Sequence, residues 1–255
     1  MIPLKDSVRT SRRPVLTVAL IAVNLLVFVW AINAPDQVLR STDGRAVLVP
    51  GFDAVTAEYG FVPCELVSDC PLGSNVVDLP PPIEVRDVPV ELTLVTSMFM
   101  HGGWPHLLGN MLFLWIFGNN IEDRVGRRWF LAFYLLGGLA ATALQFAFDP
   151  SSAVPNIGAS GAIAAVLGGY LRLYPRASVI TLIGWIPLPL PAMFFLVIWF
   201  AMQVASAGSG LVQVGADAGG VAYFAHIGGF LFGLASIGWW AGRNPRRTRG
   251  PARLG

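Results

Sequence analysis

Charged side chains are scarce in this sequence of 255 residues, of which only 13% are Asp, Glu, Lys or Arg. In a soluble domain, about a quarter of the residues are charged. Hydrophobic residues make up 55% of the chain, and its mean hydropathy is +0.63. The scarcity of charge therefore excludes an ordinary soluble domain and indicates a polytopic membrane protein.

Motifs of several other membrane proteins are missing. The sequence has no His-Glu-x-x-His motif and no pair of aspartates within its apolar segments, so zinc proteases and aspartyl intramembrane proteases are excluded. The apolar segments also have no paired ionisable residues and no inverted repeat, which argues against a transporter or a channel.

Histidine is rare, with three residues in the chain. His101, His106 and His226 are the candidates for a zinc site. On one helix, however, His101 would point about 140° away from His106, because successive residues are about 100° apart. We therefore expect no metal and no other cofactor.

Six apolar segments are long enough to cross a hydrocarbon layer of about 30 Å as helices. The first is too long for a cleaved signal peptide and lacks a small-x-small cleavage site after it, so we expect it to be retained. The sequence predicts an all-α polytopic membrane protein with a membrane domain over residues 15–241. The six spans are expected near Val15–Ile32, Ser97–Phe117, Trp129–Phe148, Gly158–Tyr174, Ile186–Ala207 and Gly219–Ala241.

The distribution of basic residues predicts the orientation. Lys and Arg gather in the tails, residues 1–14 and 242–255, whereas Asp149–Ile157 and Gly208–Ala218 contain none. Short basic segments stay in the cytoplasm, so both termini are expected there. The charge of the tails suits anionic membrane lipid, and we expect no nucleic-acid partner.

The long connection over residues 33–95 is expected to lie outside and to form short helices at the membrane interface. It contains the only two cysteines, Cys64 and Cys70. A disulfide closing so short a ring would contribute about 2 kcal/mol. A disulfide and free thiols both remain open, whereas a metal pair is not expected because no histidine lies nearby.

A serine lies at the external end of the fourth predicted span, in the sequence Gly158-Ala159-Ser160-Gly161. The first N–H groups of a helix have no intrahelical partner, so they face negative charge that develops on a carbonyl attacked by Ser160. The alternative is structural: Gly158 and Gly161 make a thin helix for close packing, and Ser160 is one more small residue.

An imidazole, His226, lies about seven residues into the sixth predicted span, which has no acidic residue. Gly229 and Gly233 fall within about 60° of it on a helix, so the face that carries His226 has little bulk and can approach the fourth span. A histidine that only bonds to a neighbouring carbonyl remains the alternative.

Two further polar residues lie in the external half of the second predicted span. His106 and Asn110 are four residues apart and therefore share one helical face. Both offer N–H donors of the type that stabilises a tetrahedral oxyanion. The alternative is that they only bond to neighbouring helices.

Four motifs occur in one order along the chain: His106-x-x-x-Asn110, Glu122-x-x-x-Gly126, Gly158-x-Ser160-Gly161 and Ala225-His226-x-x-Gly229-x-x-x-Gly233. Together they resemble the rhomboid intramembrane serine proteases of the bacterial type, over the six-span core from about Val15 to Ala241. The resemblance implies a six-transmembrane-helix rhomboid-like bundle with a long external first loop.

By this resemblance Ser160 is the nucleophile and His226 the general base and acid, without an acidic third member. Asn110, His106 and the Ser160 backbone N–H form the oxyanion hole. One departure concerns Ala164, where some members have an aromatic residue that stacks on the imidazole.

The resemblance also implies the biology. Substrates are expected to be transmembrane segments of membrane proteins, cut near the external face, in a bacterial plasma membrane. Access is expected past the fifth span, whose cytoplasmic end contains Pro187, Pro189 and Pro191. The alternative function is a catalytically silent rhomboid-like protein that binds membrane clients. The sequence predicts no oligomeric state.

Overall fold

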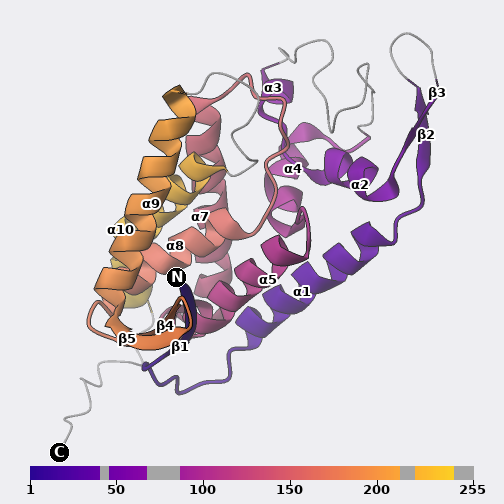
Figure 1. Cartoon of the computed structure of the whole chain (residues 1–255). Coiled ribbons are helices and arrows are strands. Elements are labelled where there is room, and N and C mark those ends of the chain that lie inside the picture. The colour runs from indigo at the N-terminus through magenta and orange to yellow at the C-terminus, as the bar shows by residue number, and fades with distance from the viewer. Residues whose placement is uncertain (41–45, 68–86, 213–221, 244–255) are drawn as a thin grey trace, which may run out of the picture.

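A computed structural model describes residues 1–40, 46–67, 87–212 and 222–243 (Figure 1). Helices make up most of these residues. Three of them, α7 (Arg127–Phe148), α8 (Ser160–Leu173) and α10 (Tyr223–Gly242), pack extensively on one another, and α9 (Ala192–Val212) lies against α8 and α10. On the other side of the bundle, α1 (Val15–Ile32) lies beside α5.

Among the described residues, three helices are long and apolar enough to cross a membrane: α1, α7 and α10. The bounds of α1 agree with the first predicted span, and α7 begins two residues before the third. Helices α8 and α9 lie within or overlap the fourth and fifth predicted spans. Helix α10 begins at Tyr223 and overlaps the sixth, whose first residues lie outside the described part.

The second predicted span was wrong at both ends. The segment that begins at Ser97 is a short 3-10 turn, η1 (Ser97–Phe99), after which the helix breaks at residues 100–103. Pro105 then lies at the start of a new helix, a position that suits proline. From there α5, η2 and α6 follow one another directly, and about 22 residues at 1.5 Å each cross a 30 Å layer. Their bounds are Trp104–Phe113, Leu114–Gly118 and Asn119–Val125.

The chain is not all-α, because two small antiparallel sheets accompany the helices. The strands β1, β4 and β5 form the first sheet in that order, and β2 pairs with β3 in the second. The last residues before α9, predicted as part of the fifth span, are strand β5. The bounds are Ile2–Asp6 for β1, Gln37–Arg40 for β2, Ala46–Val49 for β3, Ser178–Ile183 for β4 and Ile186–Pro191 for β5.

Local sequence explains why β5 is a strand. Gly184 has a φ of 61°, which glycine adopts without strain, and it reverses the chain between β4 and β5. The prolines at 187, 189 and 191 donate no N–H, so they suit the edge of a sheet. They therefore end the pairing at β5 and do not weaken a helix there.

The connection over residues 33–95 contains the short helices that the sequence predicted: α2 (Gly51–Tyr59), α3 (Pro63–Leu66) and α4 (Val90–Thr96). Cys64 is fully buried, but Cys70 lies outside the described residues, so the disulfide stays a prediction. This connection bonds to the loop before α8. Phe61 and Asn156 exchange backbone hydrogen bonds, with N–O distances of 3.2 and 2.7 Å.

Glycines bring α8 and α10 into backbone contact. A Cβ added to Gly229 would collide with the carbonyl of Gly161, and one added to Gly233 would collide with the carbonyl of Ala165. The glycines of α10 thus lie on the face that approaches α8, the packing for which their spacing is suited. Such contact of small residues is how helices associate in a membrane.

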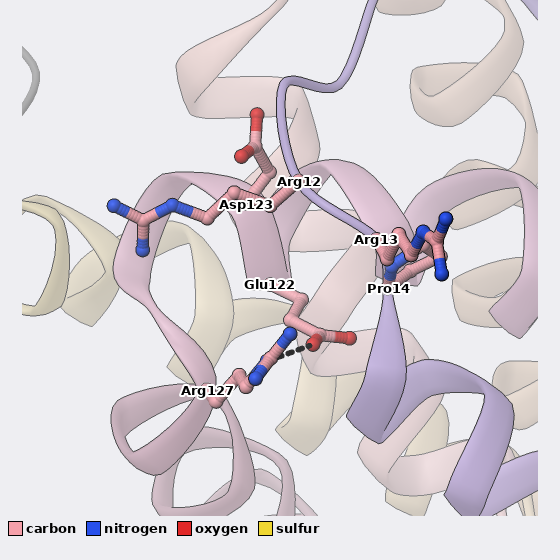
Figure 2. A pocket seen from close by; sticks show the side chains of 6 residues that line it. All are labelled: Arg12, Arg13, Pro14, Glu122, Asp123 and Arg127. Atoms are coloured by element: carbon pink, nitrogen blue, oxygen red, sulfur yellow. Dashed lines mark ion pairs between the residues drawn. The ribbon is translucent and has the colours of Figure 1, made fainter.

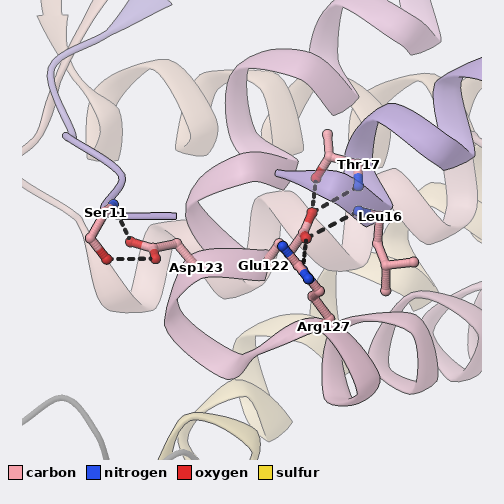
Figure 3. Close-up of polar contacts among 6 residues, drawn as sticks. All are labelled: Ser11, Leu16, Thr17, Glu122, Asp123 and Arg127. Atoms are coloured by element: carbon pink, nitrogen blue, oxygen red, sulfur yellow. Dashed lines mark hydrogen bonds and ion pairs between the residues drawn. The ribbon is translucent and has the colours of Figure 1, made fainter. Parts of the chain in front are cut away.

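The start of α1 is held by a carboxylate from another helix (Figure 3). Glu122 accepts hydrogen bonds from the Leu16 N–H at 3.0 Å, the Thr17 N–H at 2.8 Å and the Thr17 hydroxyl at 2.9 Å. Beside it, Asp123 accepts two bonds from Ser11. Because the first N–H groups of a helix lack partners, Glu122 caps α1 from α6.

A small pocket adjoins this carboxylate pair (Figure 2), lined by Arg12, Arg13, Pro14, Glu122, Asp123 and Arg127. Arg127 extends towards Glu122 with an Nε–Oε1 distance of 3.9 Å. Between the two residues, Gly126 has a φ of 87°, which suits glycine at the turn from α6 to α7. The predicted motif residues Glu122 and Gly126 thus join α1, α6 and α7.

The N-terminal strand is fixed to the bundle by Asp6. Its carboxylate accepts hydrogen bonds from the Tyr170 hydroxyl at 2.6 Å and the Asn120 amide at 2.8 Å. Burial raises the pKa of the Asp6 carboxyl above its usual value. Since Tyr170 lies in the last turns of α8, this contact marks the end of the bundle opposite to Ser160, the first residue of that helix.

We expect Gly233→Val to lower the free energy of unfolding by about 3 kcal/mol, because the new side chain must displace the backbone of α8. Reversible unfolding in detergent measures the loss. Gly242→Val is the matched control on the same helix, where an added Cβ meets nothing within 4 Å. Equal stability of the two variants would show that the Gly233 face does not pack on α8.

We expect Glu122→Ala to cost about 3 kcal/mol, because it leaves the buried Thr17 donors without an acceptor. Arg127→Gln is the control: the Arg127 side chain is 57% exposed, so loss of its ion pair should cost less than about 1 kcal/mol. Thermal unfolding of both variants in one detergent separates the two effects. Equal losses would contradict the capping role of Glu122.

Candidate active site

The structure brings Ser160 and His226 together from different helices. Ser160 is the first residue of α8, and His226 lies in the first turn of α10. The His226 Nε2 atom is 2.8 Å from the Ser160 Oγ atom, within hydrogen-bond distance. The backbone contact between α8 and α10, described above, holds the two side chains at this separation.

The N-terminus of α8 faces the same place. The Ile163 N–H donates to the Ala159 carbonyl at 2.9 Å and is the first intrahelical bond of α8. The N–H groups of Ser160, Gly161 and Ala162 thus lie in the first turn without intrahelical acceptors, at the positive end of the helix dipole.

Gly158 shapes the turn before the serine. Its φ of 118° suits glycine, and its N–H donates to the Ser97 carbonyl at 2.8 Å. A Cβ at this position would lie 2.7 Å from His106 Nε2. The missing side chain therefore lets the backbone beside Ser160 approach His106.

His106 and Asn110, both on α5, supply N–H donors. The Gly102 N–H donates to His106 Nδ1 at 3.4 Å, so in the neutral ring the proton lies on Nε2, the atom nearest Gly158. The Asn110 amide nitrogen is buried and has no hydrogen-bond partner among the described residues. Both donors are thus available to a ligand in the site.

A cavity of about 480 Å³ connects these side chains. Helices α5, α8, α9 and α10 contribute to its wall, and the volume is that of a ligand pocket. Its lining includes His106, Gly109, Asn110, Phe113, Ile157, Ser160, Ile163, Leu167, Trp199, Gln203, Ala222 and His226.

Two residues of this site were missed by the sequence analysis. Gln203 on α9 has its Oε1 atom 2.7 Å from His226 Nδ1, and the Trp199 ring lies 5.9 Å from the imidazole, tilted by 36°. A signal existed in the sequence: Gln203 is an amide in a long apolar run, four residues after Trp199 and hence on the same helical face.

The expected orientation of His101 was wrong. Its ring centroid lies 5.1 Å from that of His106, in a T-shaped arrangement, because α5 begins only at Trp104 and the two histidines do not share a helix. In the described part of the chain, no group of three or more His, Cys, Asp or Glu residues could hold a metal ion.

The fold and the site define a helical membrane protein with a hydrogen-bonded serine and histidine beside an internal cavity. Residues 91–243 match the family model described as Rhomboid domain, which covers more than half of the chain. The chain therefore belongs to the rhomboid family.

Curated relatives agree with this assignment. The chain is 34% identical over 169 residues to the presenilin-associated rhomboid-like protein A, mitochondrial, of Danio rerio, which covers 60% of the chain and 40% of the relative. It is 26% identical over 163 residues to the mitochondrial Rhomboid protein 1 of Saccharomyces cerevisiae, covering 62% and 44%. The Rhomboid protease GluP of Bacillus subtilis is 38% identical over 93 residues, covering 36% and 18%.

The chain thus spans less than half the length of these relatives. Their names place them in mitochondria and in a bacterium, and a further relative in Arabidopsis thaliana is named as chloroplastic. The comparisons support a membrane protein. They do not single out the bacterial plasma membrane that the sequence suggested.

Proposed function

We propose that this protein is an intramembrane serine endopeptidase that cleaves transmembrane segments of membrane proteins near the external face. The observation that carries the proposal is the hydrogen bond of 2.8 Å between Ser160 Oγ and His226 Nε2 beside a cavity large enough for a peptide segment. A serine and an imidazole in this contact are the elements of nucleophilic acyl transfer.

In the proposed reaction, His226 Nε2 takes the proton of the Ser160 hydroxyl as Oγ attacks the scissile carbonyl. The C–N bond then breaks, and the imidazolium returns its proton to the leaving amine. Water, deprotonated by His226, attacks the acyl-enzyme and releases the carboxylic acid product with the free serine. Each step needs one base and one acid, and His226 serves as both.

The negative charge that forms on the carbonyl oxygen needs donors. The Ser160 N–H at the start of α8, the Asn110 amide and the His106 Nε2–H are the proposed oxyanion hole. The support for this assignment is that all three residues border one cavity and that the Asn110 amide lacks another partner among the described residues.

The proposed topology has six spans: α1, the continuous helical run from Trp104 to Val125, α7, α8, α9 and α10. Four of these separate β1 from β4, and the two strands pair, so an even number of crossings between them is required. The rings of Trp129 and Trp239, with Arg243 over the latter at 3.6 Å, suit a cytoplasmic membrane interface.

Substrates are proposed to be transmembrane segments that unwind at their external portion. A membrane helix bonds its own backbone internally, so a peptide bond reaches Ser160 only after local unwinding. The cavity lies between α5 and α9, and the exposed apolar side chains of these helices, Leu108 and Met202 among them, suit lipid around an entry path.

We expect Ser160→Ala and His226→Ala each to abolish cleavage of a reporter transmembrane segment, because one removes the nucleophile and the other the base. A fluorophosphonate probe should label the unchanged protein and not Ser160→Ala. Helix content and thermal unfolding in detergent serve as controls for folding. Full cleavage by either variant would contradict the proposal, and a folded unchanged protein that neither cleaves nor labels would favour a client-binding rhomboid-like protein instead.

For Asn110→Ala we expect a loss of about 10²-fold in kcat, because one oxyanion donor among several is removed. Leu108→Ala is the matched control on α5, since Leu108 is 55% exposed and lies outside the cavity lining. Steady-state cleavage by both variants is the measurement. An unaltered kcat in Asn110→Ala would return this residue to a role in helix packing.

A further inference from the structure

The atom Nδ1 of His226, on the ring edge away from Ser160, contacts an amide from another helix. Gln203 Oε1 lies 2.7 Å from Nδ1. Gln203 borders the cavity, whereas its neighbours on α9, Met202 and Val204, are 45% and 47% exposed and face away. A polar amide among apolar residues of a membrane helix is costly unless it bonds to a partner.

The chemistry of the amide fixes the tautomer of the ring. The oxygen of a glutamine side chain only accepts hydrogen bonds, so the proton between Oε1 and Nδ1 belongs to the imidazole. A neutral ring has one proton, and Nε2 then carries a lone pair. That lone pair faces the Ser160 hydroxyl, 2.8 Å away, which is the state that a general base requires.

The same helix also restrains the plane of the ring. The Trp199 ring, one turn before Gln203, lies 5.9 Å from the imidazole. It takes the side of His226 for which Ala164, too small to stack, offers no ring. Among the described residues, His226 therefore receives its hydrogen-bonding and ring restraints chiefly from α9, and Tyr223 of α10 contacts it edge-on at 6.5 Å.

We propose that Gln203 is a positioning residue, which holds His226 in the Nδ1–H tautomer with Nε2 directed at Ser160, and so makes a seated α9 a condition for an active base. This inference rests on the proposed function. Gln203 takes the place that a carboxylate has in a serine–histidine–aspartate triad, but a neutral amide orients the ring without adding charge.

The expected effect follows from this difference. Loss of a neutral hydrogen bond that fixes the tautomer should lower kcat and the rate of fluorophosphonate labelling about tenfold. The KM should stay unchanged, because the contact is with His226 and not with the substrate. A merely structural role would instead lower stability and leave the activity of the folded fraction intact.

Three variants of α9 test the inference. Gln203→Met keeps the shape and removes the acceptor, and we expect the tenfold loss in kcat. Gln203→Glu keeps an oxygen at the same reach, and we expect it to restore labelling to at least the level of the unchanged protein. Val204→Met introduces the same residue one position further on, where the side chain is exposed, and we expect no change.

A second measurement does not depend on activity. The chain has three histidines, so two-bond ¹H–¹⁵N correlation spectra of the detergent-solubilised protein contain few imidazole signals, and His226→Ala assigns one of them. We expect the Nδ1–H tautomer for His226 in the unchanged protein and in Gln203→Glu. In Gln203→Met we expect the signal to move towards a mixture of tautomers.

The outcomes separate the two proposals. If Gln203→Met labels at the rate of Val204→Met and keeps the Nδ1–H tautomer, the role of Gln203 is overturned while the serine protease remains. If the unchanged protein does not label, the protease proposal fails, and the tautomer spectra still decide whether Gln203 fixes the ring. Equal loss of activity in Gln203→Met and Gln203→Glu with normal spectra would also overturn the inference.

Discussion

Close contact between the backbones of α8 and α10 is the constraint on which the site depends. Lipid tails are as apolar as leucine, so membrane helices gain little from burying apolar side chains against one another and associate through close packing. Gly229 and Gly233 permit that packing against the carbonyls of Gly161 and Ala165. The distance between Ser160 and His226 follows from it, because each side chain stands at the start of one of the two helices. Function here requires small residues as much as reactive ones.

Sequence reasoning predicted what hydropathy and spacing can encode. The bounds of α1 agree because a long apolar run is flanked by polar residues on both sides. Hydropathy does not distinguish an apolar strand from part of a span, so β5 was assigned to the fifth helix although its alternating prolines suit a sheet edge. The second span was placed too early because Ser97–Phe99 is apolar as well, and the break that follows depends on Gly102 and Gly103.

The contacts of His226 show a different limit. Ser160, His226 and Asn110 belong to short motifs, so the sequence could single them out, and the structure brings them to one cavity. Gln203 belongs to no such motif. Its contact depends on the rotation of α9 about its own axis and on where that helix crosses α10, and neither can be derived from apolar spacing when the helix is apolar on nearly all sides. A lone amide in a membrane helix is the one cue that sequence offers, and it names no partner.

The three-stranded sheet has a consequence for biosynthesis. Ile2 pairs with Leu182, so the first strand of the chain finds its neighbour only after four helices have been made and inserted. Until then β1 must remain on the ribosomal side of the bilayer with its backbone donors bonded to water. Loop closure over so long a separation is slow compared with local helix formation. Completion of the sheet, fastened by Asp6 to Tyr170, is therefore a late event that reports correct insertion of the first four spans before α9 arrives.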